Sequence, residues 1–247
     1  MSSTATVRPL SAADLSAAAD LHRRVLDMEF LSRYGSAFMR AYYRAWIEAP
    51  GAIAVASVGE HGELLGVLLG ATDPAAHVRG MVRRRGLGLG ARLAAHCLRH
   101  PSLARDLVVT RGRRYVGGLA RLLVPRGRRS AGSAGAPNPP APNPPAPDAP
   151  HVATAVGEIT HVLVDTDRQG SGVGGALIEA AVAVARGAGV DELVLVTPPD
   201  LEARNFYEHL GWLADGEITS RSGELFLRYR LPLADGGEGP VSDRRPS

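Results

Sequence analysis

A proline-rich tract divides this chain and limits which segments can share one core. Residues 136–150 contain Ala-Pro-Asn-Pro-Pro twice in succession, and proline offers no backbone N–H to a helix or a sheet. Such a tract stays extended and solvated, so a core must come from the blocks on either side of it. Of the 247 residues, 45% are hydrophobic, which is enough for one such core. The sequence therefore predicts a single domain over 1–233, interrupted by an insertion and followed by a disordered tail over 234–247.

The insertion is strongly basic, whereas the rest of the chain is acidic. Residues 74–153 hold 14 arginines and two acids, a net charge of +12, and the remainder holds 14 arginines and 23 acids, a net charge of −9. Arginine is the only basic residue besides histidine, and its clusters flank apolar, helix-like stretches at Leu87–Leu98 and Val116–Val124. We expect a basic helical part over 74–129 and a flexible Pro/Ala-rich linker over 130–153.

The two flanking blocks alternate between strand and helix patterns, which predicts an α/β (α+β) fold. The first block predicts a strand, two helices and a hairpin, at Val7–Leu10, from Ser11 to Val25, at Ser32–Ile47, and at Ile53–Val58 with Leu64–Gly70. The second block predicts strands at Val156–Val164, Leu193–Thr197, Trp212–Thr219 and Glu224–Leu231, with helices at Gly174–Ala188 and Asp200–Leu210.

A glycine-rich turn, Gly170-Ser-Gly-Val-Gly-Gly175, joins a strand to a helix in the second block. Small residues let backbone N–H groups point at an anion, and the helix dipole adds to the attraction, so the turn is a candidate phosphate site. A tight turn without a ligand is the alternative. The turn also matches the Gly-x-Gly-x-x-Gly dinucleotide fingerprint, but Asp165–Gln169 intervene after the strand and Asp191 precedes the next strand instead of ending it. We therefore reject a dinucleotide site.

Two motifs in this block resemble those of the GCN5-related N-acetyltransferase (GNAT) superfamily. Gln169-x-x-Gly172-x-Gly174 is similar to the superfamily's pyrophosphate signature, and Ala203-x-Asn205-Phe206-Tyr207-x-x-x-Gly211-Trp212 is similar to its second motif. The order of elements from Val7 to Leu233 also fits once 74–153 is set aside. The resemblance implies a mixed, mostly antiparallel central sheet flanked by helices, with the insertion placed before the cofactor-binding strand.

The resemblance implies acetyl-CoA as co-substrate, with no metal. Its pyrophosphate would be bound by the turn, through Gln169, Gly170, Ser171, Gly172, Val173, Gly174 and Gly175. Its pantetheine arm would pair with the backbone of Val162, Leu163 and Val164, like an added strand. Asn205 would contribute a side-chain hydrogen bond. Asp200 stands where the family often has asparagine, which favours a helix N-cap over a cofactor contact there.

Glu158 and Tyr207 are the candidate catalytic residues. Glu158 lies 11 residues before Gln169, where the resemblance implies a carboxylate that takes the ammonium proton, although a solvent-facing strand residue is the alternative. Tyr207 matches the tyrosine that protonates the departing thiolate, and we expect core packing to fall to Phe206 instead. His161 is a second candidate base; in a regular strand it faces away from Glu158, and a bulge would change that.

The implied activity is transfer of an acetyl group from acetyl-CoA to a primary amine by direct attack, with a small molecule as the acceptor. A protein or peptide acetyltransferase and a non-catalytic CoA-binding module are the alternatives. Each candidate acceptor residue could equally be an ordinary surface or packing residue; the candidates are Arg33, Tyr34, Tyr42, Tyr43, Arg44, Glu217 and Arg221. The arginines of the insertion are either simply solvated or bind an anionic ligand, lipid surface or nucleic acid.

Cys97 is the only cysteine, so no internal disulfide can form, and no Cys/His pair has zinc-site spacing. The sequence shows neither a secretory signal nor an apolar stretch of about 18 residues that could span a membrane. We expect a cytoplasmic protein without a transmembrane segment, and a homodimer is left open.

Overall fold

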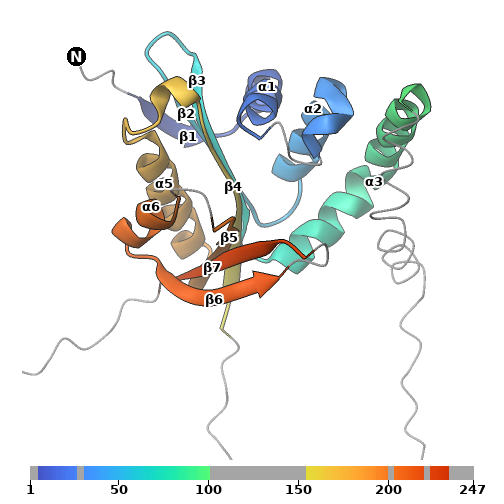
Figure 1. The fold of residues 1–247 in the computed structure, drawn as a ribbon. Coiled ribbons are helices and arrows are strands. Elements are labelled where there is room, and N and C mark those ends of the chain that lie inside the picture. Colours follow the sequence, from blue (N-terminus) through green and yellow to red (C-terminus); the bar gives the residue numbers. More distant parts are fainter. Residues whose placement is uncertain (1–4, 27–30, 101–153, 200–202, 220–222, 234–247) are drawn as a thin grey trace, which may run out of the picture. The chain divides into compact units, whose positions relative to one another are not determined.

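The computed structural model describes residues 5–26, 31–100, 154–199, 203–219 and 223–233 (Figure 1). The chain divides into two compact units, one made of Met1–Ala94 with Thr154–Ser247 and the other of Ala95–Ala153. The predicted helix at Val116–Val124, the linker and the tail lie outside the described residues. The sheet, the helices around it and the candidate site belong to the first unit.

Seven strands form one sheet in the order β1-β2-β3-β4-β5-β7-β6. They are β1 (Thr6–Pro9), β2 (Ala52–Val58), β3 (Leu64–Ala71), β4 (Val156–Val164), β5 (Glu192–Thr197), β6 (Leu213–Thr219) and β7 (Leu225–Pro232). All neighbours pair antiparallel except β4 and β5, which are parallel. This confirms the predicted mixed, mostly antiparallel sheet, and the pairing of β3 with β4 joins the two blocks that the insertion separates in sequence.

Helices cover both faces of the sheet. They are α1 (Leu15–Val25), α2 (Gly35–Ile47), α3 (Pro74–Arg99), α5 (Val173–Gly187) and α6 (Ala203–His209), with short 3-10 turns η1 (Ala12–Asp14), η2 (Leu31–Tyr34) and η3 (Thr166–Arg168). Figure 1 shows α1 and α2 together on one side of the sheet and α5 with α6 on the other. We call these two sides the α1/α2 face and the α5 face.

Each face has its own core. On the α5 face, Ile53, Leu68, Leu177 and Leu193 are at most 1% exposed and pack in one cluster. Gly66 of β3 lies so close to α5 that an added Cβ would stand 2.9 Å from Leu177 Cδ1, which explains the lack of a side chain there. On the α1/α2 face, Trp46 Nε1 of α2 donates to the Gly70 carbonyl oxygen at 3.1 Å. The strands between them are therefore buried on both sides, which explains their long apolar runs.

The first helix is held at its start by an ion pair. Both terminal nitrogens of Arg8 donate to the two carboxylate oxygens of Asp14 at 2.7 and 2.8 Å, and the Ser11 N–H and hydroxyl donate to Asp14 Oδ2. These hydrogen bonds hold the pKa of Asp14 well below its usual value. The sequence signal at Ser11–Asp14 thus marks the true beginning of this helical region, although its first turn is 3-10 rather than α.

The basic segment begins as one helix, α3, instead of a helix starting near Leu87. The Asp73 carboxylate accepts the Ala76 N–H at 2.8 Å as an N-cap, and Pro74 takes the first helical position, where its missing N–H costs nothing. The compact first unit extends through Ala94, so it includes most of this helix. Leu87 itself is 94% exposed, which shows that apolar content was a poor guide to burial here. No helix of the described residues has the length and hydropathy to cross a bilayer.

Candidate active site

Strands β4 and β5 separate partway along their length. They pair in parallel from Val156 with Glu192 to Ile159 with Leu195. Beyond Ile159, the described residues of β4 no longer pair with β5. The opposite edge of β4 remains paired with β3 as far as Val164. The backbone groups of residues 162–164 that point toward β5 therefore lie beside an opening in the sheet. An extended ligand can add to such an edge as a further strand would.

A bulge in β4 sits where this opening begins. Gly70 of β3 pairs with Ile159 and Leu69 pairs with His161, which leaves Thr160 as an extra residue. One extra residue reverses the alternation of side chains, so Glu158 and His161 share the α1/α2 face while Ile159 packs in the core of the α5 face. The strand is therefore not regular, and the bulge that the sequence left open puts Glu158 and His161 on the same face.

Glu158 is half-buried on the α1/α2 face, close to two basic groups. Burial raises the pKa of its carboxyl group above the usual value, because the charged form loses solvation. His161 and Arg228 act in the opposite direction and lower the pKa, but burial has the larger effect. Arg228 is itself held by Asp215, with 3.1 Å between Nε and Oδ2. A carboxylate with a raised pKa is a stronger base, as deprotonation of an ammonium group requires.

His161 belongs to a buried aromatic cluster between β4 and the two helices. Its ring centroid lies 5.0 Å from that of His22, 6.5 Å from Tyr42 and 6.3 Å from Trp46. His22, which is fully buried, shares a 3.0 Å hydrogen bond between its Nδ1 and the Tyr43 hydroxyl. The cluster therefore gives His161, at 8% exposure, a packing role, and it also places an imidazole next to Glu158.

The glycine turn follows the carboxyl end of β4, the end at which β4 and β5 separate. Gly170 and Gly172 have φ angles of 74° and 86°, a region that other residues rarely adopt, and Gly172 is the N-cap of α5. The first bond of the helix runs from the Ala176 N–H to the Gly172 carbonyl oxygen at 3.0 Å. The N–H groups of the preceding helical residues thus have no acceptor within the helix, and they form a place for an anion.

Two further contacts shape this turn. An added Cβ on Gly174 would stand 3.1 Å from Phe206 Cζ, so this glycine allows α6 to pack on the first turn of α5. On the other side, Arg24 of α1 forms an ion pair of 2.9 Å with Asp165, the N-cap of η3. These contacts hold the glycine turn against α6, which carries the second sequence motif, and against α1.

Tyr207 and Phe206 have the reverse of the expected burial. Tyr207 is 8% exposed and packs in the core of the α5 face, with ring centroids 5.8 Å from Trp212 and 5.9 Å from Tyr229, whereas Phe206 is only partly buried. The expectation that Phe206 would be the core aromatic is therefore wrong. A helix of seven residues that ends at the Gly211 turn points both rings inward. Burial raises the pKa of Tyr207 to about 12, so its phenol keeps its proton at neutral pH.

The remaining candidates divide into exposed and buried groups. Asn205 is exposed on α6, Ser171 is exposed in the turn, and its hydroxyl donates to the Arg168 carbonyl oxygen. Leu163 is fully buried on the α1/α2 face, so only its backbone is available to a ligand. Among the candidate acceptor residues, Tyr34, Tyr42 and Tyr43 are buried, so these side chains pack the core. Asp200 and Arg221 lie outside the described residues. The described residues contain no cluster of three side chains that could hold a metal ion.

Sequence reasoning missed His22 and Arg228 as neighbours of the site. His22 falls at the spacing of Leu15, Ala18 and Val25, so the helical stripe already indicated that it faces the core. Arg228 alternates with Leu227 and Tyr229, and therefore belongs to the opposite face of β7 from these apolar residues. Glu158 pairs with Val194, and Arg228 pairs with Val196, two residues further along β5. Glu158 and Arg228 therefore lie on the same face of the sheet, the α1/α2 face.

Comparisons with known proteins agree with this geometry. Residues 122–212 match the model of the Acetyltransferase (GNAT) family. The described part of this match contains β4, the glycine turn, α5, β5 and α6. No curated protein matches the chain in sequence.

Solved structures show the same fold at low sequence identity. The protein SsHAT is 20% identical, with a TM-score of 0.55 over 94% of this chain and 100% of that one. A protein from Corynebacterium glutamicum, described as histone acetyltransferase HPA2 and related acetyltransferase, is 17% identical, with a TM-score of 0.52 over 95% and 99%. The ribosomal-protein-S18-alanine N-acetyltransferase of Escherichia coli is 14% identical, with a TM-score of 0.50 over 96% and 99%.

Proposed function

We propose that the chain transfers an acetyl group from acetyl-CoA to a primary amine of a small molecule by direct attack, because residues 122–212 match the model of the Acetyltransferase (GNAT) family. One observation carries the proposal: a carboxylate with a raised pKa, an opening between parallel strands and a helix N-terminus with a glycine turn all meet at β4. Each supplies one need of the reaction, namely a base, a channel for the thioester arm and a site for the pyrophosphate.

The residues present fit this co-substrate. The backbone N–H groups from Gln169 to Gly175 would hold the pyrophosphate, with the positive φ of Gly170 and Gly172 turning them toward it. The backbone of Val162–Val164 would pair with the pantetheine arm along the open edge of β4. Asn205, exposed on α6, would donate or accept one further hydrogen bond.

Glu158 and Tyr207 would handle the protons. Glu158 takes a proton from the acceptor's ammonium group, directly or through water, which frees the nitrogen to form a bond to the acetyl carbon. As the carbon–sulfur bond breaks, Tyr207 protonates the departing thiolate, and the second proton that the nitrogen loses as the amide forms restores the phenol through water. The two side chains approach from opposite faces of the sheet, and the opening between β4 and β5 is where they can act on one bound thioester.

A peptide or protein acceptor is the second candidate. Next to Glu158 the α1/α2 face continues onto strands that are partly open to solvent, since Val196 is 48% exposed and the side chains of Arg228 and Arg230 are each 40% exposed. An extended chain has room on such a surface. A panel of small amines, amino sugars and peptides, assayed by thiol release from acetyl-CoA, separates the two classes. Silence across the panel with CoA still bound would favour a CoA-binding module without catalysis.

A matched pair of glycine variants tests the cofactor site. Gly172→Val and Gly62→Val place the same side chain at φ angles of 86° and 82°, and an added Cβ meets no atom within 4 Å at either position. The backbone strain is therefore alike, but only Gly172 belongs to the turn. Calorimetry should show that acetyl-CoA binding is lost in Gly172→Val and kept in Gly62→Val. Normal affinity in Gly172→Val would refute the turn as the pyrophosphate site.

A further inference from the structure

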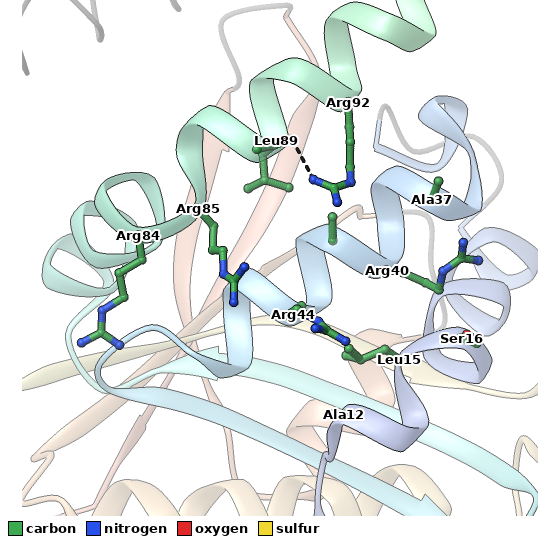
Figure 2. A pocket seen from close by; sticks show the side chains of 12 residues that line it. Ala12, Leu15, Ser16, Ala37, Arg40, Arg44, Arg84, Arg85, Leu89 and Arg92 are labelled. Atoms are coloured by element: carbon green, nitrogen blue, oxygen red, sulfur yellow. Dashed lines mark hydrogen bonds between the residues drawn. The ribbon is translucent and has the colours of Figure 1, made fainter.

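A cavity of about 660 Å³ lies among α1, α2 and α3, away from the glycine turn (Figure 2). Its walls come from the outward side of α2 and the facing side of α3, with the start of α1 at its base. Five arginines line it and, within the described chain, its lining contains no aspartate or glutamate: Arg40, Arg44, Arg84, Arg85 and Arg92. The site unites arginines of the basic segment with two from the acidic part of the chain.

Helical spacing explains why these arginines gather. Arg40 and Arg44 are one turn apart on α2, about 6 Å along its axis, and Ala37 and Ala41 lie beside them. The opposite side of α2 carries the buried Tyr42, Tyr43 and Trp46. On α3, Arg85 and Arg92 are two turns apart, with Gly88 and Leu89 between them. Small residues on both helices leave the room into which the guanidinium groups extend.

The wall formed by α3 is fixed to the end of α2. His77 is 1% exposed, its ring lies 4.6 Å from that of Trp46, and its Nδ1 donates to the Pro50 carbonyl oxygen at 3.1 Å. A Cβ on Gly80 would collide with the ring of Pro50, so the two segments are in close contact. The cavity is therefore a built feature of the first unit, held by buried contacts.

Most of the positive charge in the cavity has no carboxylate partner. Arg85 binds both oxygens of Glu48 at 2.7 and 2.9 Å. Arg84 and Arg92 donate only to backbone carbonyl oxygens, of Glu48 and Gly88. The side chains of Arg40 and Arg44 form no hydrogen bond or ion pair with any described residue. Guanidinium groups gathered around one cavity repel one another unless an anion joins them.

We propose that this cavity binds a small organic polyphosphate such as a nucleoside triphosphate. Its volume lies within the range of about 300–1,000 Å³ typical of small-ligand sites. The planar guanidinium group of an arginine can donate to two phosphate oxygens at once. Several arginines around one cavity can therefore bind several phosphate groups. Leu15, Leu89 and the alanines offer an apolar surface for the body of the ligand. The lining has no aromatic side chain on which successive bases could stack, which argues against single-stranded nucleic acid.

Calorimetry with ATP, with adenosine as the ligand lacking phosphate, tests the proposal on the full chain at low salt. Arg44→Glu should weaken ATP binding at least tenfold. Arg186→Glu is the matched control, because Arg186 is an exposed helical arginine on α5, on the other face of the sheet. Arg92→Glu, on the other wall, should reproduce the loss, so the test does not depend on the folding of one variant. Adenosine should not bind.

The Gly172→Val variant separates this site from the proposed cofactor site. It should lose acetyl-CoA but keep ATP, whereas Arg44→Glu should keep acetyl-CoA. The proposal is wrong if ATP does not bind the wild-type protein, if Arg44→Glu and Arg92→Glu bind it normally, or if only Gly172→Val loses it. Tighter binding of an acidic peptide or an oligonucleotide than of ATP would also overturn it.

Discussion

The two faces of the central sheet are built from different residues. The α5 face is apolar, with Ile53, Leu68, Leu177 and Leu193 packed in one cluster. The α1/α2 face instead carries two histidines, a half-buried glutamate and an arginine, namely His22, His161, Glu158 and Arg228. Strand β4 contributes to both, and its bulge at Thr160 decides which side chain goes where.

This difference indicates that the two faces have separate roles, one in stability and the other in catalysis. The apolar face holds β4 and α5 in register, which fixes the glycine turn and the opening beside it. The polar face places Glu158 where burial raises the pKa of its carboxyl group, at some cost in stability. We therefore expect changes in the apolar packing of the α5 face to alter stability and leave turnover unchanged, and changes at Glu158 to alter turnover with only a small effect on stability.

The largest effect is expected on the α5 face. Leu177→Ala removes a fully buried side chain from the core cluster and should lower the free energy of unfolding by about 2–5 kcal/mol. Leu177→Met, which nearly conserves volume, should cost less than about 1.5 kcal/mol. Urea titration gives both values. The turnover number of the folded fraction should match the wild type, and a large fall in it would break the proposed division.

Tyr207 is an exception to this division between the two faces, because it lies in the core of the α5 face and is proposed to donate a proton. Tyr207→Phe should lower kcat at least tenfold, about 1.4 kcal/mol in activation free energy, while acetyl-CoA still binds. Tyr229→Phe removes a hydroxyl from the neighbouring ring and serves as the control. Equal kcat values in the two variants, measured by thiol release, would remove Tyr207 from the mechanism.

A smaller effect should appear in the pH dependence. Arg228 lowers the pKa of Glu158, so Arg228→Gln should raise that pKa further. The acid limb of the kcat/KM profile, where the base becomes protonated, should move to higher pH. Arg230→Gln is the matched control, because Arg230 lies two residues further along β7, on the same face, and its side chain forms an ion pair of 3.4 Å with Glu192. A limb that stays in place in Arg228→Gln, or moves equally in both variants, would contradict the assignment.

The smallest effect concerns stability. The pKa of Glu158 is higher in the folded protein than in the unfolded chain, so the folded state binds more protons and loses stability as pH rises through that pKa. Glu158→Gln should therefore be more stable than the wild type at neutral pH. The difference should shrink as pH falls toward the ordinary pKa of glutamate, about 4.3. Thermal unfolding at both pH values measures it, and a destabilised variant at neutral pH would show a structural role instead.

Much of the fold was visible in local sequence. The strand Val156–Val164 was predicted with its observed bounds, and the helix predicted at Gly174–Ala188 is observed at Val173–Gly187, because alternation, glycines and apolar stripes are local signals. The two motifs also lie close together in the structure. The packing of Phe206 on Gly174 is the contact that joins them.

What could not be predicted depends on partners far away in the chain. The bulge at Thr160 exists only in the pairing with β3, so sequence spacing alone could not decide which face His161 occupies. Tyr207 is buried because Trp212 and Tyr229 surround it, and a family motif says nothing about that. The long α3 depends on the contact of His77 with Trp46, which charge and composition do not reveal.

The most direct test is thiol release by Glu158→Gln, measured across pH beside the wild type at saturating acetyl-CoA. The substitution keeps the size of the side chain and removes only its ability to take a proton. We predict a fall in kcat of about 10²–10⁴-fold, with the acid limb lost and acetyl-CoA affinity retained. Turnover within twofold of the wild type, with the same acid limb, would contradict the account and transfer the role of base to another group.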